Sequence, residues 1–139
     1  MKLKVFNKEN STMLVSGEPL VRISVKAGLF SFSKDAGVLL GLNNGNKIEF
    51  VQDEETKIDW FISITDSKDG FSCRSDGQKF PRFDFNSRGL TKAILDSIKF
   101  KGTGVSFKIQ ENPVELEGSK YYLILTSKLI NPTPTVNAK

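Results

Sequence analysis

The chain has 139 residues, of which 38% are hydrophobic and 26% are charged, and its formal net charge is +4. This size and composition are typical of one folded domain that needs no disulfide or metal for stability. Histidine is absent and cysteine occurs once, as Cys73, so the usual zinc ligands and the common nucleophile and base pairs are missing. We therefore expect no cofactor, no metal site and no enzymatic activity, and we interpret Cys73 as a small core residue.

The N-terminal residues MKLKVFNKEN are basic, but no apolar run follows them. The sequence also lacks any stretch of about 18 apolar residues, the length that a membrane-spanning helix needs. We therefore expect neither a signal peptide nor a membrane helix. These features predict a cytoplasmic protein.

Residues 19–28 (PLVRISVKAG) alternate between apolar and polar side chains, which is the pattern of a half-buried strand. Residues 29–32 (LFSF) continue the alternation as a second strand. The Ser33 hydroxyl suits the N-terminal cap of a short helix, and Gly41 suits the left-handed residue that ends it. Because Gly37 weakens this helix, we expect it to be held by the packing of Val38, Leu39 and Leu40.

Two more strands are predicted at residues 47–51 (KIEFV) and 57–65 (KIDWFISIT), joined by the acidic loop QDEET. In the second of these strands, alternation places four apolar side chains on the core side, namely Ile58, Trp60, Ile62 and Ile64. The segments KLKVF and TMLVS, near the N-terminus, are expected to form a preceding hairpin.

The second half of the chain repeats this layout. RFDF at 82–85 corresponds to LFSF, Asn86 or Ser87 can cap a helix within residues 88–100, and VSFKI and KYYLILT correspond to the later strands. The predicted inward residues of that helix are Leu90, Ala93, Ile94 and Ile98. Two unrelated strand-helix-hairpin runs are the alternative interpretation.

These patterns predict an α+β domain of short antiparallel strands that form a barrel or sheet with two helices. The domain is expected to cover residues 1–129, with two pseudo-repeats at about 20–65 and 71–127. The residues at 130–139 contain two X-Pro units and are predicted to be a loosely ordered tail. In the predicted repeat, Phe30 and Phe32 correspond to Phe83 and Phe85.

The segment LVRISVKAGLFSFSKDAGVLLGLNNGNKIEFVQDEETKIDWFIS resembles the swapped-hairpin DNA-binding module of the AbrB, SpoVT and MazE group, above all in LLGLNNGNKIEF. The resemblance covers about a third of the chain and implies strands that pair into a barrel. Two tandem copies would form a single-chain pseudo-dimer. Among the family's basic contact positions, Arg22 is the one that remains, while Ser33 stands where the family usually has proline.

A weaker resemblance uses the same strands counted differently. Four strands and a helix at residues 2–41, followed by four strands and a helix at 47–99, are similar to the layout of the Whirly single-stranded-DNA-binding proteins. The Lys-Gly-Lys-Ala motif of that family is absent from this chain. Both resemblances imply a partner that is DNA.

Charge is distributed unevenly along the chain. Residues 1–34 hold six basic and two acidic side chains, residues 68–101 hold eight and four, and residues 47–62 hold two and five. In FSCRSDGQKFPRF, basic side chains surround an aromatic ring, a composition that suits contact with a phosphate backbone and with bases. We expect phosphates to be bound by Arg22, Lys26, Arg74, Lys79 and Arg82, and a base or sugar to stack on Phe80.

The sequence therefore predicts a non-enzymatic nucleic-acid-binding protein, with single strand, duplex and transcription regulation all left open. The alternative is a protein-interaction or structural module, with a protein partner or a second copy of the chain. Such a module needs exposed apolar surface. Strand alternation offers three outward candidates for it, namely Val51, Phe61 and Tyr122.

Overall fold

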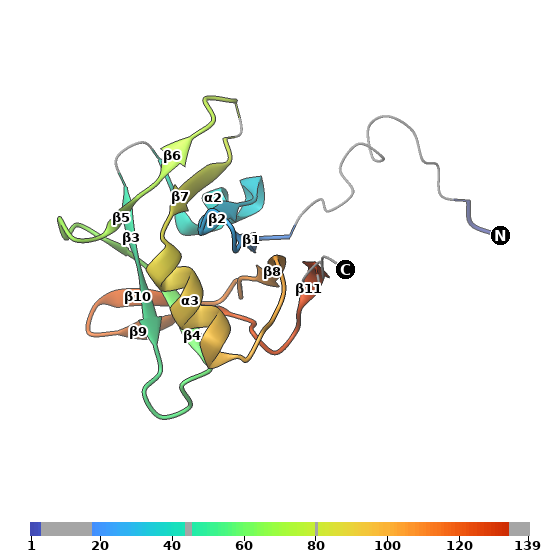
Figure 1. Cartoon of the computed structure of the whole chain (residues 1–139). Helices are drawn as coiled ribbons and strands as arrows, with labels where there is room; N and C mark the ends of the chain where they lie inside the picture. The colour runs from blue at the N-terminus through green and yellow to red at the C-terminus, as the bar shows by residue number, and fades with distance from the viewer. Residues whose placement is uncertain (4–17, 44–45, 80, 134–139) are drawn as a thin grey trace.

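The computed structural model describes residues 1–3, 18–43, 46–79 and 81–133. In these ranges the chain forms two helices and two antiparallel sheets, as expected for the α+β class (Figure 1). The strands remain in two sheets and do not close into a barrel, so the barrel alternative was wrong. The hairpin expected from KLKVF and TMLVS lies almost entirely outside the described residues.

The larger sheet has six strands, and every pairing in it is antiparallel. Its spatial order is β11 (Ile130–Thr133), β8 (Gly104–Lys108), β1 (Leu20–Ser24), β2 (Leu29–Phe32), β7 (Phe83–Asn86) and β6 (Arg74–Ser75). Because residues 130–133 form β11, the predicted loose tail was wrong for that part. Residues 134–139 lie outside the described ranges.

The smaller sheet has five antiparallel strands. Its spatial order is β5 (Phe71–Ser72), β3 (Lys47–Gln52), β4 (Trp60–Thr65), β10 (Ser119–Ile124) and β9 (Val114–Leu116). The two helices are α2 (Lys34–Leu40) and α3 (Arg88–Ser97). Neither helix is long and apolar enough to cross a membrane.

The two sheets meet at two places. Cys73 links β5 in the smaller sheet directly to β6 in the larger one. On the other side, an isolated bridge pairs Ile109, just after β8, with Ile124 at the end of β10. The apolar faces of both sheets therefore enclose one shared core.

Phenylalanine rings from four strands and both halves of the chain build the centre of this core. Phe85 stacks on Phe30 at 4.8 Å and on Phe71 at 4.7 Å between ring centroids, and Phe50 lies 5.3 Å from Phe30. Offset and tilted aromatic pairs at such distances are stabilising beyond the area that they bury. Phe30, Phe32, Phe83 and Phe85 are all buried in the same cluster, so both halves of the chain contribute to one core.

The predicted helix ends are confirmed. The Ser33 hydroxyl accepts a hydrogen bond from Ala36 N at 3.2 Å, and Gly41 is left-handed with φ of 69°. The amide of Leu42 returns to Gly37 O at 2.9 Å, which completes the C-terminal cap. Of the two caps considered for the second helix, Ser87 is the one used, since its hydroxyl accepts from Leu90 N at 3.1 Å.

Three side chains expected in the core lie outside it. Val38 is 76% exposed and Ile58 is 48% exposed, and Ala93 is also exposed. The core sides of the two helices are formed by Leu40 and Ile94, as expected, together with Ala36, Gly37, Thr91 and Leu95.

Cys73 is buried, with 7% of its surface exposed, so its predicted place in the core is confirmed. Burial, followed by the negative charge of Asp84, raises the pKa of the Cys73 thiol from 9.0 to about 11, against the opposing charge of Arg74. The unfolded thiol ionises more readily, so the contribution of Cys73 to stability is present below pH 9 and is lost as pH rises towards 11.

We expect alkylation of Cys73 by iodoacetamide at pH 8 to be at least about 10-fold slower in the folded protein than in the urea-unfolded chain. The reason is that the thiolate is the reactive form, and a pKa higher by two units lowers its population about 100-fold, which outweighs the greater nucleophilicity of a more basic thiolate. Mass spectrometry of timed aliquots gives both rates. Equal rates in the two states would contradict the buried position.

Candidate nucleic-acid interface

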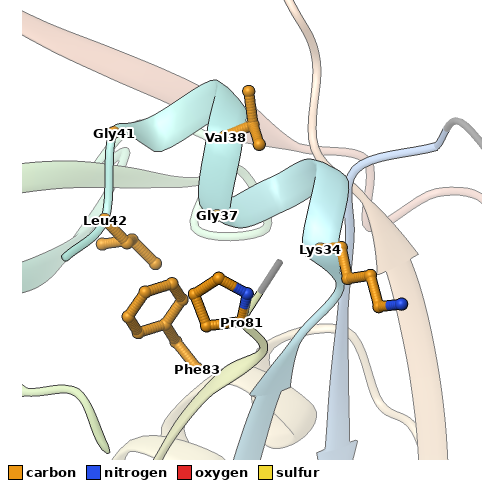
Figure 2. Close-up of a pocket in the computed structure, with 7 residues that line it drawn as sticks. All are labelled: Lys34, Gly37, Val38, Gly41, Leu42, Pro81 and Phe83. Carbon is orange, nitrogen blue, oxygen red and sulfur yellow. The ribbon is translucent and has the colours of Figure 1, made fainter. Parts of the chain in front are cut away.

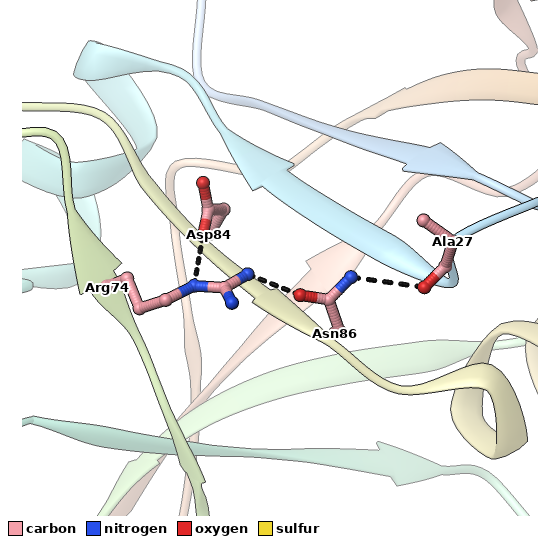
Figure 3. A network of polar contacts seen from close by, with 4 residues as sticks. All are labelled: Ala27, Arg74, Asp84 and Asn86. Carbon is pink, nitrogen blue, oxygen red and sulfur yellow. Dashed lines mark hydrogen bonds and ion pairs between the residues drawn. The ribbon is translucent and has the colours of Figure 1, made fainter.

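Arg74 is held at the base of the hairpin formed by β6 and β7. Its Nε lies 2.7 Å from Asp84 Oδ1 on the paired strand, and its Nη2 donates to Asn86 Oδ1. Asn86 Nδ2 in turn donates to Ala27 O at 3.1 Å, so Asn86 links Arg74 to the turn between β1 and β2 (Figure 3). The side chains of Arg74 and Asp84 are 61% and 43% exposed, so solvent screens their attraction.

Lys26 and Arg88 lie beside the same turn. Lys26 immediately precedes Ala27 and is exposed. Gly28 brings the turn against the start of α3, because Ser87 N donates to Gly28 O at 2.8 Å and a Cβ on Gly28 would lie 2.8 Å from Arg88 Cα. Arg88 is also exposed. Three basic residues from three separate segments therefore meet here.

Lys79 and Arg82 extend this surface along the hairpin. The Asp76 carboxylate accepts from Gln78 N at 3.1 Å and from Arg82 N at 3.2 Å, which closes the loop between β6 and β7. Lys79 and Arg82 are exposed on that loop, which projects from the top of the molecule in Figure 1. Phe80 is outside the described residues, so its expected stacking role stays a prediction.

We call the surface formed by these five side chains the basic face: Lys26, Arg74, Lys79, Arg82 and Arg88. The sequence identified four of them. Arg88 was missed because it was counted only as part of a helix. Its position directly after the cap Ser87, within the basic region 68–101, was the available signal.

Arg22 is not part of the basic face. Its guanidinium donates to Ser106 Oγ at 3.2 Å, to Asn131 O at 3.1 Å and to Thr133 Oγ1 at 3.0 Å, which ties β11 to the rest of the larger sheet. Strand register places Arg22 three strand spacings from Arg74, or roughly 14 Å at about 4.8 Å per strand. Arg22 has a structural role here, and its expected phosphate contact stays a prediction.

An open groove of about 210 Å³ lies beside the hairpin, between α2 and the start of β7 (Figure 2). It is lined by Lys34, Gly37, Val38, Gly41, Leu42, Pro81 and Phe83. Apart from the amine of Lys34, these side chains are apolar. The groove therefore combines apolar walls with one cation.

Acidic side chains gather at the other end of the molecule. The loop between β3 and β4 carries Asp53, Glu54, Glu55 and Asp59, and it lies at the bottom of Figure 1, far from the β6–β7 hairpin. The described residues contain no group of three or more acidic, cysteine or histidine side chains placed to hold a metal ion. A concentration of acidic side chains therefore lies at the opposite end of the molecule from the β6–β7 hairpin.

The outer face of the smaller sheet is apolar in part. Val51 pairs with Phe61, which pairs with Leu123 on the next strand, and all three point away from the core. Val114 and Leu116 on the edge strand β9 are 46% and 58% exposed. Val51 and Phe61 are therefore outward as expected, whereas Tyr122 was wrong, because it packs against the core. This face is the observation that bears on the interaction-module alternative.

No family model, no curated protein sequence and no solved structure matches this chain. The resemblances to the AbrB, SpoVT and MazE group and to the Whirly proteins therefore stay predictions.

Proposed function

We propose that this protein binds nucleic acid through the basic face. The observation that carries the proposal is the convergence of Lys26, Arg74 and Arg88 around one turn, through Asn86 and the close approach at Gly28. A cluster of cations on a folded surface attracts a polyanion and gains affinity by releasing its counterions. The acidic loop at the opposite end orients the protein with this face towards the phosphates.

The ion pair with Asp84 leaves Arg74 able to bind phosphate. A guanidinium has five N–H donors, and the bonds to Asp84 and Asn86 use two of them. The pair also fixes the side chain, so less conformational freedom is lost when a phosphate binds. Asp84 reduces the local positive charge, so we expect the phosphate contact of Arg74 to add less affinity than that of a cation with no carboxylate beside it.

We also propose that the two halves are related by an approximate two-fold axis, as in a single-chain pseudo-dimer. In such an arrangement equivalent strands pair with each other and equivalent residues pair crosswise. The antiparallel pairing of β2 with β7 has Phe30 opposite Phe85 and Phe32 opposite Phe83, which supports this arrangement. β4 pairs with β10 in the same way, and β1 with β8 corresponds to β5 with β3. This pairing fits a single-chain pseudo-dimer, although the strands form two sheets and not the barrel that the swapped-hairpin resemblance implies.

Neutralising three side chains of the basic face tests the proposal. We expect the triple variant K26Q/K79Q/R82Q to bind single-stranded and duplex DNA more weakly, and to reduce the slope of log affinity against log salt by about 1 for each phosphate that the protein no longer neutralises. The weakening should be similar for all DNA sequences, because phosphate contacts carry no sequence information. Fluorescence anisotropy at several salt concentrations measures both quantities.

The matched control is K101Q/K120Q/K128Q, which removes the same charge from exposed lysines outside the basic face. We expect it to change affinity and slope much less. Equal weakening in the two triple variants would show that net charge alone attracts DNA. Absence of binding by the wild-type protein at about 50 mM salt, where even non-specific contacts are strong, would overturn the proposal.

In that last case the interaction module becomes the better account. The observation in its favour is the outward apolar row of Val51, Phe61 and Leu123, continued by the exposed Val114 and Leu116. Five acidic residues lie on the strands and loops of this face, namely Glu49, Asp53, Glu54, Glu115 and Glu117, beside three lysines, namely Lys47, Lys57 and Lys120. The acidic side chains are in the majority, so the matching partner is a protein whose apolar side chains are flanked mainly by lysine or arginine.

A further inference from the structure

The groove between α2 and β7 is lined by two glycines, Gly37 within α2 and Gly41 at its left-handed C-terminal cap. Lys34 and Gly37 are three residues apart and therefore share a face of the helix. A Cβ on Gly37 would lie 3.1 Å from the Phe83 ring, whereas a Cβ on Gly41 would meet nothing within 4 Å. The groove is therefore closed beside Gly37 and open beside Gly41.

The other walls of the groove are apolar and firmly held. Phe83 and Leu42 are 3% and 9% exposed and belong to the core, and Pro81 leads into β7. Val38 lies at the rim of the groove and is 76% exposed, so it presents an apolar side chain to solvent. The volume of about 210 Å³ is below the roughly 300 Å³ at which pockets accept drug-sized ligands. It suits a single flat ring system.

Charge around the groove favours a ring that carries a phosphate. Lys34 lies at the end nearest the start of α2 (Figure 2), and Pro81 is adjacent in sequence to Arg82 of the basic face. Two carboxylates lie close in sequence to these cations: Asp35 directly follows Lys34, and Asp76 lies in the loop that leads to Arg82. Asp76 accepts bonds from the backbone of its own loop, so it is oriented into the hairpin.

We propose that this groove holds one unpaired base of a single-stranded nucleic acid whose phosphates contact Lys34 and the basic face. The inference rests on the proposed function and makes it more specific, because a paired base has no free face to place against Val38 and Pro81. Stacking of a base on an exposed aromatic ring strengthens single-strand binding by about 5- to 150-fold. Because Phe83 is only 3% exposed and the base rests on the aliphatic Val38 and Pro81, we expect the lower end of that range. The groove therefore gives the protein a preference for single strands over duplexes.

The test compares two oligonucleotides of about eight nucleotides, a length within the usual range of single-strand sites. One is oligothymidine and the other has the same backbone without bases. We expect the protein to bind oligothymidine at least about 5-fold more tightly. In methyl-labelled protein, the NMR signals of Val38 and Leu42 should shift with oligothymidine and not with the abasic strand, while those of Val51 stay unchanged with both.

The variant Val38→Gln should reduce the ratio of the two affinities towards one. Val51→Gln is the matched control, since Val51 is also exposed but lies on the outer face of the smaller sheet, and it should leave the ratio unchanged. Equal binding of both strands with unshifted Val38 and Leu42 signals would overturn the base groove and leave the basic face as the binding site. Binding of neither strand would overturn the proposed function itself.

Discussion

Replacing Trp60 by alanine is expected to lower the free energy of unfolding by about 3 to 5 kcal/mol, the usual range for deleting a large buried aromatic side chain. Trp60 is 5% exposed and lies with Ile62 on the core face of β4. Its Nε1 donates to Ser97 Oγ at 2.8 Å, which ties β4 to the last residue of α3. The substitution therefore opens a cavity and also removes a link between the smaller sheet and a helix.

Urea unfolding followed by circular dichroism measures this change, because the variant has no tryptophan to report by fluorescence. Phe61→Ala is the matched control, since Phe61 is the next residue along the strand and its side chain lies half-buried on the outer face. We expect it to cost less than about 1.5 kcal/mol. A larger destabilisation for Phe61 than for Trp60 would show that the two faces of β4 are reversed.

Alternation predicted the strands well wherever a strand is flanked by paired neighbours. Val21, Ile23, Phe30 and Phe32 are all buried as expected, because β1 and β2 lie inside the larger sheet and have one face against the core. Ile58 was wrong for a local reason. The backbone bond from Asp53 N to Asp59 O closes the loop before β4, so the period of two does not extend back to residue 58.

The predicted inward face of the second helix was incomplete for a different reason, because it left out a polar residue. Thr91, Ile94 and Leu95 form the inward side of α3, and the cap residue Ile98 continues it, at the spacing expected of a helix face. Thr91 was not counted because its side chain is polar. Its hydroxyl donates to Ser87 O at 2.9 Å, which satisfies the polar group locally and allows it to be buried.

The basic face could be predicted only as a set of charges. Lys26 and Arg74 are far apart in sequence, and they meet because β2 pairs with β7 and Asn86 reaches Ala27. No local pattern encodes such a pairing. The same limit explains Arg22, whose three hydrogen-bond partners lie on β8 and β11, more than 80 residues away.

Gly28→Ala is expected to lower the free energy of unfolding by about 2 to 5 kcal/mol, from two contributions. The left-handed φ of 61° at Gly28 costs a residue with a Cβ about 1 to 2 kcal/mol. The new Cβ would also lie 2.8 Å from the backbone N and Cα of Arg88. Because these are backbone atoms, the turn and the start of α3 must separate, which costs about 1 to 3 kcal/mol in a packed region.

Gly118→Ala separates the two contributions. Gly118 also has a left-handed φ, of 81°, but a Cβ there would meet nothing within 4 Å. We expect it to cost only the roughly 1 to 2 kcal/mol of backbone strain, as measured by urea unfolding under the same conditions. Gly28→Ala should in addition weaken DNA binding in the anisotropy assay, because it moves Lys26 away from Arg88. Equal destabilisation of the two variants, with DNA binding unchanged, would show that the close approach at Gly28 does not assemble the basic face.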